Sequence, residues 1–208
     1  MLQPVSLEGR FVRLEPLSLD HFPALAAAAA GPRETFVYTL VPDGETEMRK
    51  FVEDALAMQA AGTAVPLATI DRASGRVVGT TRFFDIQFWD WPTGSPYQRG
   101  EELPDALEIG YTWLSPSAQR TGINTESKLL MLTHAFETWQ VHRVRLVTDA
   151  RNERSRRAIE RLGARFDGVL RAARTAFDGG IRDSAYYSIL DSEWPDAKTA
   201  LAKRLRPA

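Results

Sequence analysis

The stretch ALEIGYTWLSPSAQRTGINTESKLLMLTHAFETW, residues 106–139, contains the features that decide the fold. Its beginning, 106–114, is rich in apolar, aromatic and β-branched side chains and predicts a strand. Further along, apolar side chains recur at helical spacing and predict a helix over 123–139; they are Leu129, Leu132, Phe136 and Trp139, with Leu130 and Met131 widening the apolar face. A strand that leads into a long buried helix is half of a crossover unit and indicates a sheet with parallel strands.

The flanking segments predict further strands and helices. Strands are expected at 10–16, 65–70, 76–86, 143–148, 164–171 and 182–190, and helices at 19–30, 46–61 and 152–162, with Ser18 and Thr46 as N-caps. Residues 65–86 read as a hairpin. The segments 106–148 and 143–171 each form a strand–helix–strand unit, which implies parallel neighbours with right-handed connections. The predicted fold class is therefore mixed α/β, with one central sheet flanked by helices.

The chain shows no internal repeat and no low-complexity linker. Residues 1–208 are therefore expected to form a single domain. Its core is expected to extend from about 8 to 194. Residues 195–208 read as a polar tail that forms a helix or frays.

The composition excludes several classes of function. A net charge of −1 provides no basic field for a polyanion, so nucleic acid is not an expected partner. The chain has no cysteine, and its three histidines lack metal-ligand spacing, so neither a thiol nucleophile nor a metal site is expected. The N-terminus lacks the pattern of a signal peptide, and the apolar run 24–30 is too short to cross a bilayer. A cytoplasmic protein without membrane contact is expected.

The turn QRTGIN, residues 119–124, is a candidate phosphate site because it opens the long helix. The N-terminus of a helix presents free N–H groups and a partial positive charge, which together bind phosphates. Gly122 would allow a close backbone approach, and Arg120 would add a full charge. An ordinary polar turn with one glycine is equally consistent with the spacing, and the Gly-Lys-Ser/Thr of a nucleotide P-loop is missing.

Asn152 and Ser155 open the next predicted helix. Taken alone they read as an N-cap and a residue of the first turn, as in many helices. Their position adds to this, because both helix starts follow adjacent parallel strands and so face the sheet edge where α/β ligands bind. A small multiply charged anion is also favoured by the arginines between 151 and 174, which are Arg151, Arg154, Arg156, Arg157, Arg161, Arg165, Arg171 and Arg174.

Taken together, these motifs resemble those of a known family. The turn at 119–124 and the segment DARNERSRRAIERLGA at 149–164 resemble motifs A and B of the GNAT acetyltransferase superfamily. LEIGY at 107–111, GVLR at 168–171 and YSIL at 187–190 are similar to its RimJ/RimL-like branch, which includes ribosomal-protein N-terminal acetyltransferases. The resemblance extends from about residue 10 to residue 194.

The resemblance implies a fold in which the strands 106–114 and 143–148 splay apart around the pantetheine arm of acetyl-CoA. It implies that the cofactor is bound by Trp113, Leu114, Gln119, Arg120, Thr121, Gly122, Ile123 and Asn124, with Asn152 on the pantetheine arm. Asn124 departs from the family pattern, which usually has Gly or Ala there, so the role of its side chain is open. A homodimer is an arrangement that the resemblance allows.

The expected reaction is direct attack of an amine on the thioester, since no cysteine can form an acyl-enzyme. Backbone N–H groups near Trp113 or Leu114 would stabilise the oxyanion. Glu108 is the first candidate for the general base, with Asp85 in reserve, although Glu108 could equally be a surface residue of its strand. The resemblance suggests that Ser155 protonates the departing sulfur, and a structural serine is nearly as consistent.

The chain is therefore expected to be an acetyl-CoA-dependent N-acetyltransferase for a protein N-terminus or a small-molecule amine. A non-catalytic acyl-CoA-binding regulatory module is the alternative. The aromatic segment 87–104 reads as a cover for the acceptor, as a dimer contact or as a loop packed on itself. In the first case, replacing Trp89 and Trp91 would raise the KM for the acceptor.

Overall fold

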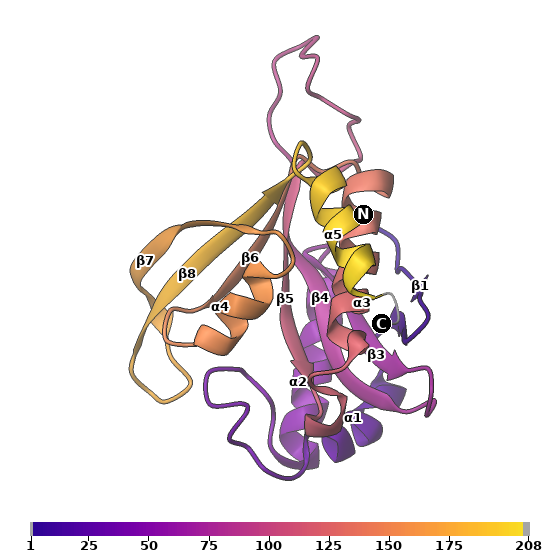
Figure 1. Cartoon of the computed structure of the whole chain (residues 1–208), viewed down its shortest axis with the longest axis vertical. Coiled ribbons are helices and arrows are strands. Elements are labelled where there is room, and N and C mark those ends of the chain that lie inside the picture. Colours follow the sequence, from indigo (N-terminus) through magenta and orange to yellow (C-terminus); the bar gives the residue numbers. More distant parts are fainter. Residues whose placement is uncertain (1, 206–208) are drawn as a thin grey trace.

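The computed structural model describes residues 2–205 and contains an eight-stranded mixed sheet with helices on both faces (Figure 1). The strands lie in the order β1-β2-β3-β4-β5-β6-β8-β7. They are β1 (Leu7–Glu8), β2 (Val12–Pro16), β3 (Ala64–Asp71), β4 (Val77–Gln87), β5 (Ala106–Leu114), β6 (Arg143–Asp149), β7 (Arg165–Thr175) and β8 (Ile181–Leu190). The helices are α1 (Phe22–Ala29), α2 (Gly44–Ala60), α3 (Gly122–Thr133), α4 (Glu153–Glu160) and α5 (Trp194–Arg204), with short turns at Leu19–His21 and Pro116–Ala118. This is the mixed α/β architecture expected from the sequence.

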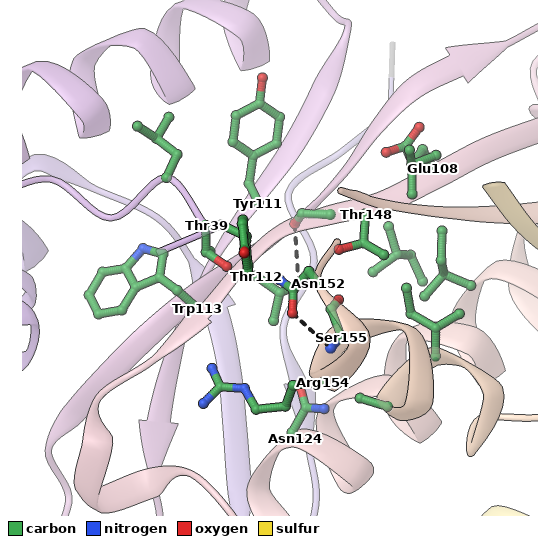
Figure 2. Close-up of a pocket in the computed structure, with 18 of the residues that line it drawn as sticks. Thr39, Glu108, Tyr111, Thr112, Trp113, Asn124, Thr148, Asn152, Arg154 and Ser155 are labelled. Atoms are coloured by element: carbon green, nitrogen blue, oxygen red, sulfur yellow. Dashed lines mark hydrogen bonds between the residues drawn. The ribbon is translucent and has the colours of Figure 1, made fainter. Parts of the chain in front are cut away.

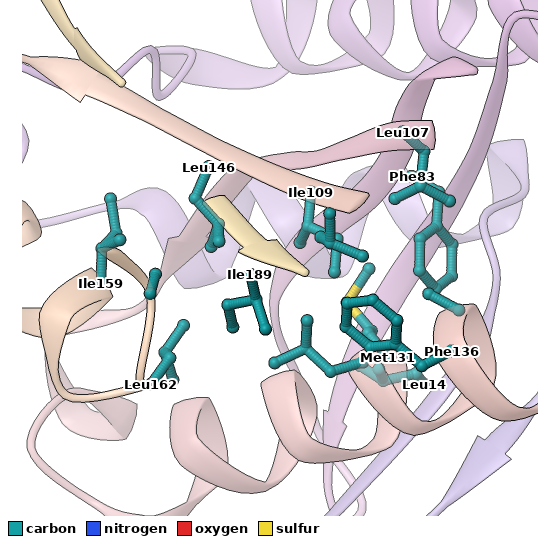
Figure 3. Packing of buried hydrophobic residues seen from close by; sticks show 14 of the residues in the cluster. Leu14, Phe83, Leu107, Ile109, Met131, Phe136, Leu146, Ile159, Leu162 and Ile189 are labelled. Carbon is teal, nitrogen blue, oxygen red and sulfur yellow. The ribbon is translucent and has the colours of Figure 1, made fainter. Parts of the chain in front are cut away.

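Two hydrophobic clusters cover the two faces of the sheet. The larger cluster joins the sheet to α3, α4 and α5, and Figure 3 shows Met131 of α3 and Ile159 of α4 beside Ile109 and Leu146 of the central strands. The smaller cluster joins the sheet to α1 and α2 and includes Trp113 of β5. The central strands are therefore covered on both faces, which explains why β5 is apolar without strict alternation.

The predicted helix over 123–139 is present but changes form near its end. Thr121 is the N-cap, and its hydroxyl accepts the N–H of Ile123 at 3.3 Å. After α3, the segment His134–Thr138 is a single π-helical turn, in which the N–H of Trp139 donates to the carbonyl of His134 at 3.0 Å. The Trp139 ring then packs edge-on against Phe83, with 4.7 Å between ring centroids.

Two sequence predictions about connections are wrong. Helix α2 begins at Gly44 with Asp43 at the N-cap, and Thr46 lies inside its first turn. Gly44 has φ of 82°, a conformation that glycine adopts without strain, and the helix begins there, two residues before the start that the apolar pattern predicts. Strands β6 and β7 are not neighbours, because β8 lies between them and pairs antiparallel with both.

The C-terminal segment is part of the core. Helix α5 buries Trp194, Ala197 and Leu201, and Trp194 stacks on Phe136 with 5.3 Å between ring centroids. The core therefore extends through α5, past the boundary expected near residue 194. The last residues of the predicted tail, 206–208, and Met1 lie outside the described part of the chain.

A buried carboxylate ties α3 to the N-terminal strands. Glu126 is only 6% exposed. Its oxygens accept the backbone N–H groups of Arg10, Phe11 and Val12 at 2.8, 2.6 and 2.9 Å. Three backbone donors of the turn before β2 thus find their acceptor on the first turns of α3, which fixes the helix against this edge of the sheet.

Among the helices described in residues 2–205, none combines the length and the apolar character needed to cross a bilayer.

Candidate active site

The parallel strands β5 and β6 pair over only three residues each and then separate. The pairs are Ala106 with Arg143, Leu107 with Val144 and Glu108 with Arg145. Beyond them, β5 continues to Leu114 and β6 to Asp149 without pairing to each other. Figure 1 shows the β6–β8–β7 part of the sheet diverging from β5. The splay expected from the resemblance is therefore present.

A cavity of about 960 Å³ opens at this divergence. Its walls come from the ends of β4 to β8, the first turns of α3 and α4, and the α1–α2 connection. Of the residues predicted for the site it brings together Glu108, Trp113, Leu114, Gln119, Arg120, Thr121, Asn124, Asn152 and Ser155. Figure 2 shows Asn152 and Ser155 between Glu108 and Arg154. The turn before α3 and the start of α4, which were predicted separately as ligand-binding segments, thus line the same cavity.

Gly122 and Ile123 line a second, smaller cavity beside the same turn and do not line this one, and their predicted contact with the cofactor stays a prediction. The side chain of Ile123 is buried in the larger cluster, and its N–H donates to Thr121. A Cβ built on Gly122 would lie 3.1 Å from the ring of Phe11, on the side of the second cavity. The glycine is therefore required by packing against Phe11, and a bulky residue there would test packing before it tested phosphate binding.

One end of the cavity carries two arginines with no carboxylate partner in residues 2–205, Arg120 before α3 and Arg154 on α4. Burial, and then the charge of Arg120, lowers the pKa of the Arg154 guanidinium, so the two cations lie close enough to repel each other. The guanidinium of Arg154 donates to Oε1 of Gln119 at 3.2 Å and to the carbonyl of Thr35 at 2.7 Å. Two uncompensated cations beside a helix N-terminus favour a multiply charged anion.

The wider arginine cluster predicted between 151 and 174 is not a single patch. Arg157 pairs with Glu153 on the surface of α4, and Arg165 pairs with Glu193. Arg151 bridges Asp149 and Asp178. Of the eight arginines only three line the cavity, namely Arg154, Arg161 and Arg174. The other five point elsewhere because strands and helix turns direct successive side chains to different sides, and Arg171 among them is simply exposed.

Strand β5 is irregular where it borders the cavity. Thr80 pairs with Trp113 and Arg82 with Gly110, so Tyr111 and Thr112 together oppose the single residue Thr81. Tyr111 has φ of 49°, an uncommon value for a residue other than glycine. Such a bulge interrupts the ladder and re-aims backbone groups. The N–H groups after it are the candidates for an oxyanion site.

Lys128 is a residue of the site that the sequence analysis missed. It is 4% exposed, lines the cavity and donates from Nζ to Oγ1 of Thr81 at 2.9 Å and of Thr112 at 2.7 Å. Burial lowers its pKa to about 7. Its place one helical turn after Asn124, within an apolar face, was the available signal.

The two candidate bases share one arginine. Glu108 is 8% exposed, and burial raises its pKa while the charge of Arg145 opposes that rise. Nε of Arg145 donates to Oε2 of Glu108 at 2.8 Å, and its Nη2 donates to Asp85 at 2.5 Å. Both carboxylates therefore lie at one end of the cavity, and Glu108 is a cavity residue and not a surface residue.

The start of α4 serves both structure and cavity. The side-chain oxygen of Asn152 accepts the N–H of Ser155 at 3.0 Å, so Asn152 is an N-cap (Figure 2). Both residues also line the cavity. The structural and the functional interpretations of this pair are thus compatible.

The aromatic segment 87–104 lies away from the cavity. In Figure 1 it projects from the end of the sheet opposite to the α1–α2 connection. Trp89 stacks on His142 with 5.7 Å between ring centroids, and Nε1 of Trp91 donates to Asp105 at 2.7 Å. None of the residues 87–104 lines the cavity within the described chain. The segment is thus not a wall of this cavity, so the expected effect of Trp89 and Trp91 on the KM loses its structural basis, while a dimer contact and a loop packed on itself remain the two alternatives.

Comparison with known proteins agrees with this geometry. Residues 12–165 match the family model described as acetyltransferase (GNAT) domain. The crystal structure of a GCN5-related N-acetyltransferase from Brucella melitensis is 31% identical and superposes with a TM-score of 0.83, over 99% of this chain and 87% of that one. Mycobacterium smegmatis RimJ in complex with CoA-disulfide shares the fold, with a TM-score of 0.77 at 20% identity over 97% of this chain and 95% of its own.

A curated relative is named "Putative ribosomal N-acetyltransferase YdaF", from Bacillus subtilis (strain 168). It is 35% identical over 98 residues, which are 47% of this chain and 52% of YdaF. The match thus spans about half the length of that curated relative. Because the family model covers residues 12–165 and a solved relative matches nearly the whole chain, the protein belongs to the GNAT acetyltransferase family, whose acetyl donor is acetyl-CoA.

Proposed function

We propose that the protein is an N-acetyltransferase in which a neutral primary amine attacks the thioester of acetyl-CoA directly. The observation that carries this proposal is the separation of β5 from β6 over a cavity that holds unpaired arginines at one end and the Glu108 carboxylate at the other. Such a cavity can hold the anionic tail of the cofactor apart from the reacting amine. The acceptor is a protein N-terminus or a small-molecule amine, and the relative YdaF is named a putative ribosomal N-acetyltransferase.

The residues at the arginine end fit the diphosphate of coenzyme A. Within residues 2–205, Arg120 and Arg154 form no salt bridge with a carboxylate that would compete with a phosphate, and Gln119 accepts a hydrogen bond from Arg154 at 3.2 Å. The N-terminus of α3 adds its partial charge. Asn124 and Asn152 present side chains to the middle of the cavity, where the amide groups of a pantetheine arm would lie.

The chemical step needs a base, an oxyanion donor and a proton for the sulfur. The amine nitrogen attacks the thioester carbonyl, and backbone N–H groups after the β5 bulge stabilise the resulting oxyanion. Glu108 accepts the proton of the ammonium, directly or through water, and its raised pKa makes it a stronger base than an exposed carboxylate. When the C–S bond breaks, the Ser155 hydroxyl supplies a proton to the thiolate and regains one from solvent, while Glu108 releases its proton to solvent. Asp85 is the reserve base, since it contacts the same arginine.

The proposal is tested by thiol release from acetyl-CoA with a panel of primary amines, with the acetylated product identified by mass. Glu108→Gln is expected to lower kcat/KM at least about 100-fold, because a general base contributes roughly that factor. The wild-type rate should rise with pH as Glu108 loses its proton, and this limb should vanish in the variant. Tight binding of acetyl-CoA without thiol release for any amine would instead support the non-catalytic acyl-CoA-binding module.

The phosphate end gives a separate prediction. Arg120→Met is expected to raise the Kd for coenzyme A about tenfold, because a charge-assisted hydrogen bond is worth about 1.5–3 kcal/mol. Arg157→Met is the matched control, since Arg157 is an exposed residue of α4 that pairs with Glu153 outside the cavity. Isothermal titration with coenzyme A measures both. Equal affinities for the two variants would contradict the placement of the diphosphate.

A further inference from the structure

The wall of the cavity formed by β7 and β8 carries a second pair of arginines. Arg174 of β7 and Arg182 of β8 lie directly opposite each other in the sheet, and both line the cavity. Arg182 is only 7% exposed, and its Nε donates to Oγ of Ser184 at 3.1 Å. Within residues 2–205 neither arginine forms a salt bridge with a carboxylate.

A buried guanidinium next to a second one, with neither in a salt bridge within residues 2–205, is an electrostatically unfavourable arrangement. The pKa of Arg182 is lowered, first by burial and then by the charge of Arg174. The nearest acids are already engaged. Asp149 at the end of β6 pairs with Arg151 at 2.8 Å, and Glu108 and Asp85 share Arg145. Asp149 and Glu108 act on Arg182 at longer range, but no carboxylate of residues 2–205 forms a salt bridge with either arginine, so both guanidinium groups can bind an anion from outside the chain.

The pair belongs to the acceptor end of the cavity. Arg182 and Tyr186 line the cavity from β8, and the ring of Tyr186 lies 5.5 Å from Cζ of Arg145, which pairs with Glu108 at 2.8 Å. In agreement with this geometry, the charges of Arg174 and Arg182 both act on Glu108, the proposed base, whereas Arg120 and Arg154 act on each other. The phosphates of the cofactor already have a matching site at the start of α3. The guanidinium groups of Arg174 and Arg182 are thus available to bind an anionic group of the acceptor, while its amine lies toward Glu108.

We propose that Arg174 and Arg182 form an anion subsite that binds a carboxylate carried by the amine acceptor. This inference rests on the proposed function and makes it specific: the substrates are amines with a carboxylate within reach, such as a peptide N-terminus followed by an acidic residue. The amine lies toward Glu108 while guanidinium donors hold the carboxylate in charge-assisted hydrogen bonds. The subsite orients the acceptor and takes no part in proton transfer.

The test compares acceptors that differ only in charge. The peptide amides Ser-Glu-Ala and Ser-Gln-Ala, and β-alanine with its amide, are acetylated by the whole enzyme, and kcat/KM is measured for each. For the wild type, kcat/KM is expected to be at least about tenfold higher for the acceptor that carries the carboxylate than for its neutral counterpart, because one charge-assisted hydrogen bond contributes about that factor. Turnover with no preference for either carboxylate would overturn the subsite and leave the proposed acetyl transfer intact.

Two variants and a control locate the preference. Arg182→Met and Arg174→Met are each expected to reduce the ratio between acidic and neutral acceptor to near one. Arg174 is exposed, so its variant should fold even if that of the buried Arg182 does not. Arg171→Met is the matched control, because Arg171 is an exposed arginine of the same strand that does not line the cavity. A ratio that falls equally in this control would show a general charge effect and overturn the assignment.

A binding measurement separates the two sources of anion and needs no turnover. N-acetylated Ser-Glu-Ala-amide is titrated into each protein in the presence of coenzyme A, and coenzyme A is titrated alone. The Arg174→Met variant should bind the acetylated acidic peptide about tenfold more weakly than the wild type, with an unchanged Kd for coenzyme A. Loss of coenzyme A affinity with retained peptide affinity would assign the arginines to a cofactor phosphate and refute the proposal.

Discussion

Replacement of Glu126 by alanine is expected to destabilise the protein by about 3 kcal/mol, because its buried carboxylate accepts one buried and two part-buried backbone N–H groups. The variant leaves the N–H groups of Arg10, Phe11 and Val12 without their acceptor. Each buried donor without a partner costs about 1–3 kcal/mol. Urea unfolding at neutral pH measures the change.

Glu126→Gln and Glu153→Ala are the informative controls. Glutamine keeps one side-chain oxygen and should recover part of the loss. Glu153 is an exposed residue of α4 in a surface pair with Arg157, and its removal should cost less than about 1 kcal/mol. A loss for Glu126→Ala as small as that of Glu153→Ala would mean that water replaces the carboxylate, and the link between α3 and the N-terminal strands would not be needed for stability.

Lys128 lies two residues after Glu126 on α3. Its replacement by methionine is expected to stabilise the protein by several kcal/mol below neutral pH. Lys128 is buried without a carboxylate partner within residues 2–205 and hydrogen-bonds only to two hydroxyls. Methionine fills a similar volume without a charge to desolvate. The hydroxyls of Thr81 and Thr112 lie 2.8 Å apart and keep each other as partners in the variant.

The pH dependence gives this prediction its sign. Burial lowers the pKa of Lys128 from 10.5, the value of an exposed lysine, to about 7 in the folded protein. Between these limits the unfolded chain holds a proton that the folded protein has lost, so the wild type gains stability as the pH rises. Below about pH 7 the ammonium is charged in both states and the full penalty of burial applies.

The measurement is the urea midpoint of wild type and Lys128→Met at pH 6 and pH 9. Between pH 6 and pH 9 the free energy of unfolding should rise more in the wild type than in the variant. Lys50→Met serves as the control, since Lys50 is exposed and pairs with Asp54 one turn away. If Lys128→Met were less stable than the wild type at pH 6, the ammonium would have to be stabilised by something other than the two threonines.

The sequence predicts which segments form strands and helices better than it predicts which strands are adjacent in the sheet. Strand β5 has the bounds expected from its apolar run, because a buried central strand shows a continuous local pattern. The position of β8 between β6 and β7 was missed, since crossover and hairpin connections look alike in a single sequence. The π-helical turn at His134–Thr138 also has no periodic signature, because it shifts hydrogen bonds and leaves the apolar residues in place.

The candidate site was predicted where local chemistry is visible and missed where tertiary packing decides. Residues at the starts of α3 and α4 could be named because a helix N-terminus after a strand has a known place in a sheet. The contact between Gly122 and Phe11 could not be predicted, because Phe11 lies in the bend before β2, far away in sequence. Lys128 and Arg182 were missed because a lysine in a helix and an arginine in a strand normally point to water.

The short pairing between β5 and β6 has a consequence for how the protein can change during evolution. Beyond the pair Glu108–Arg145, the facing edges of β5 and β6 form no hydrogen-bonded pairs with each other. An extended ligand with amide groups can take the place of an absent strand there, and it would be recognised by main-chain atoms that every residue possesses. Side chains along this seam could therefore vary with little loss of donor binding, while new acceptors are selected at the opposite wall.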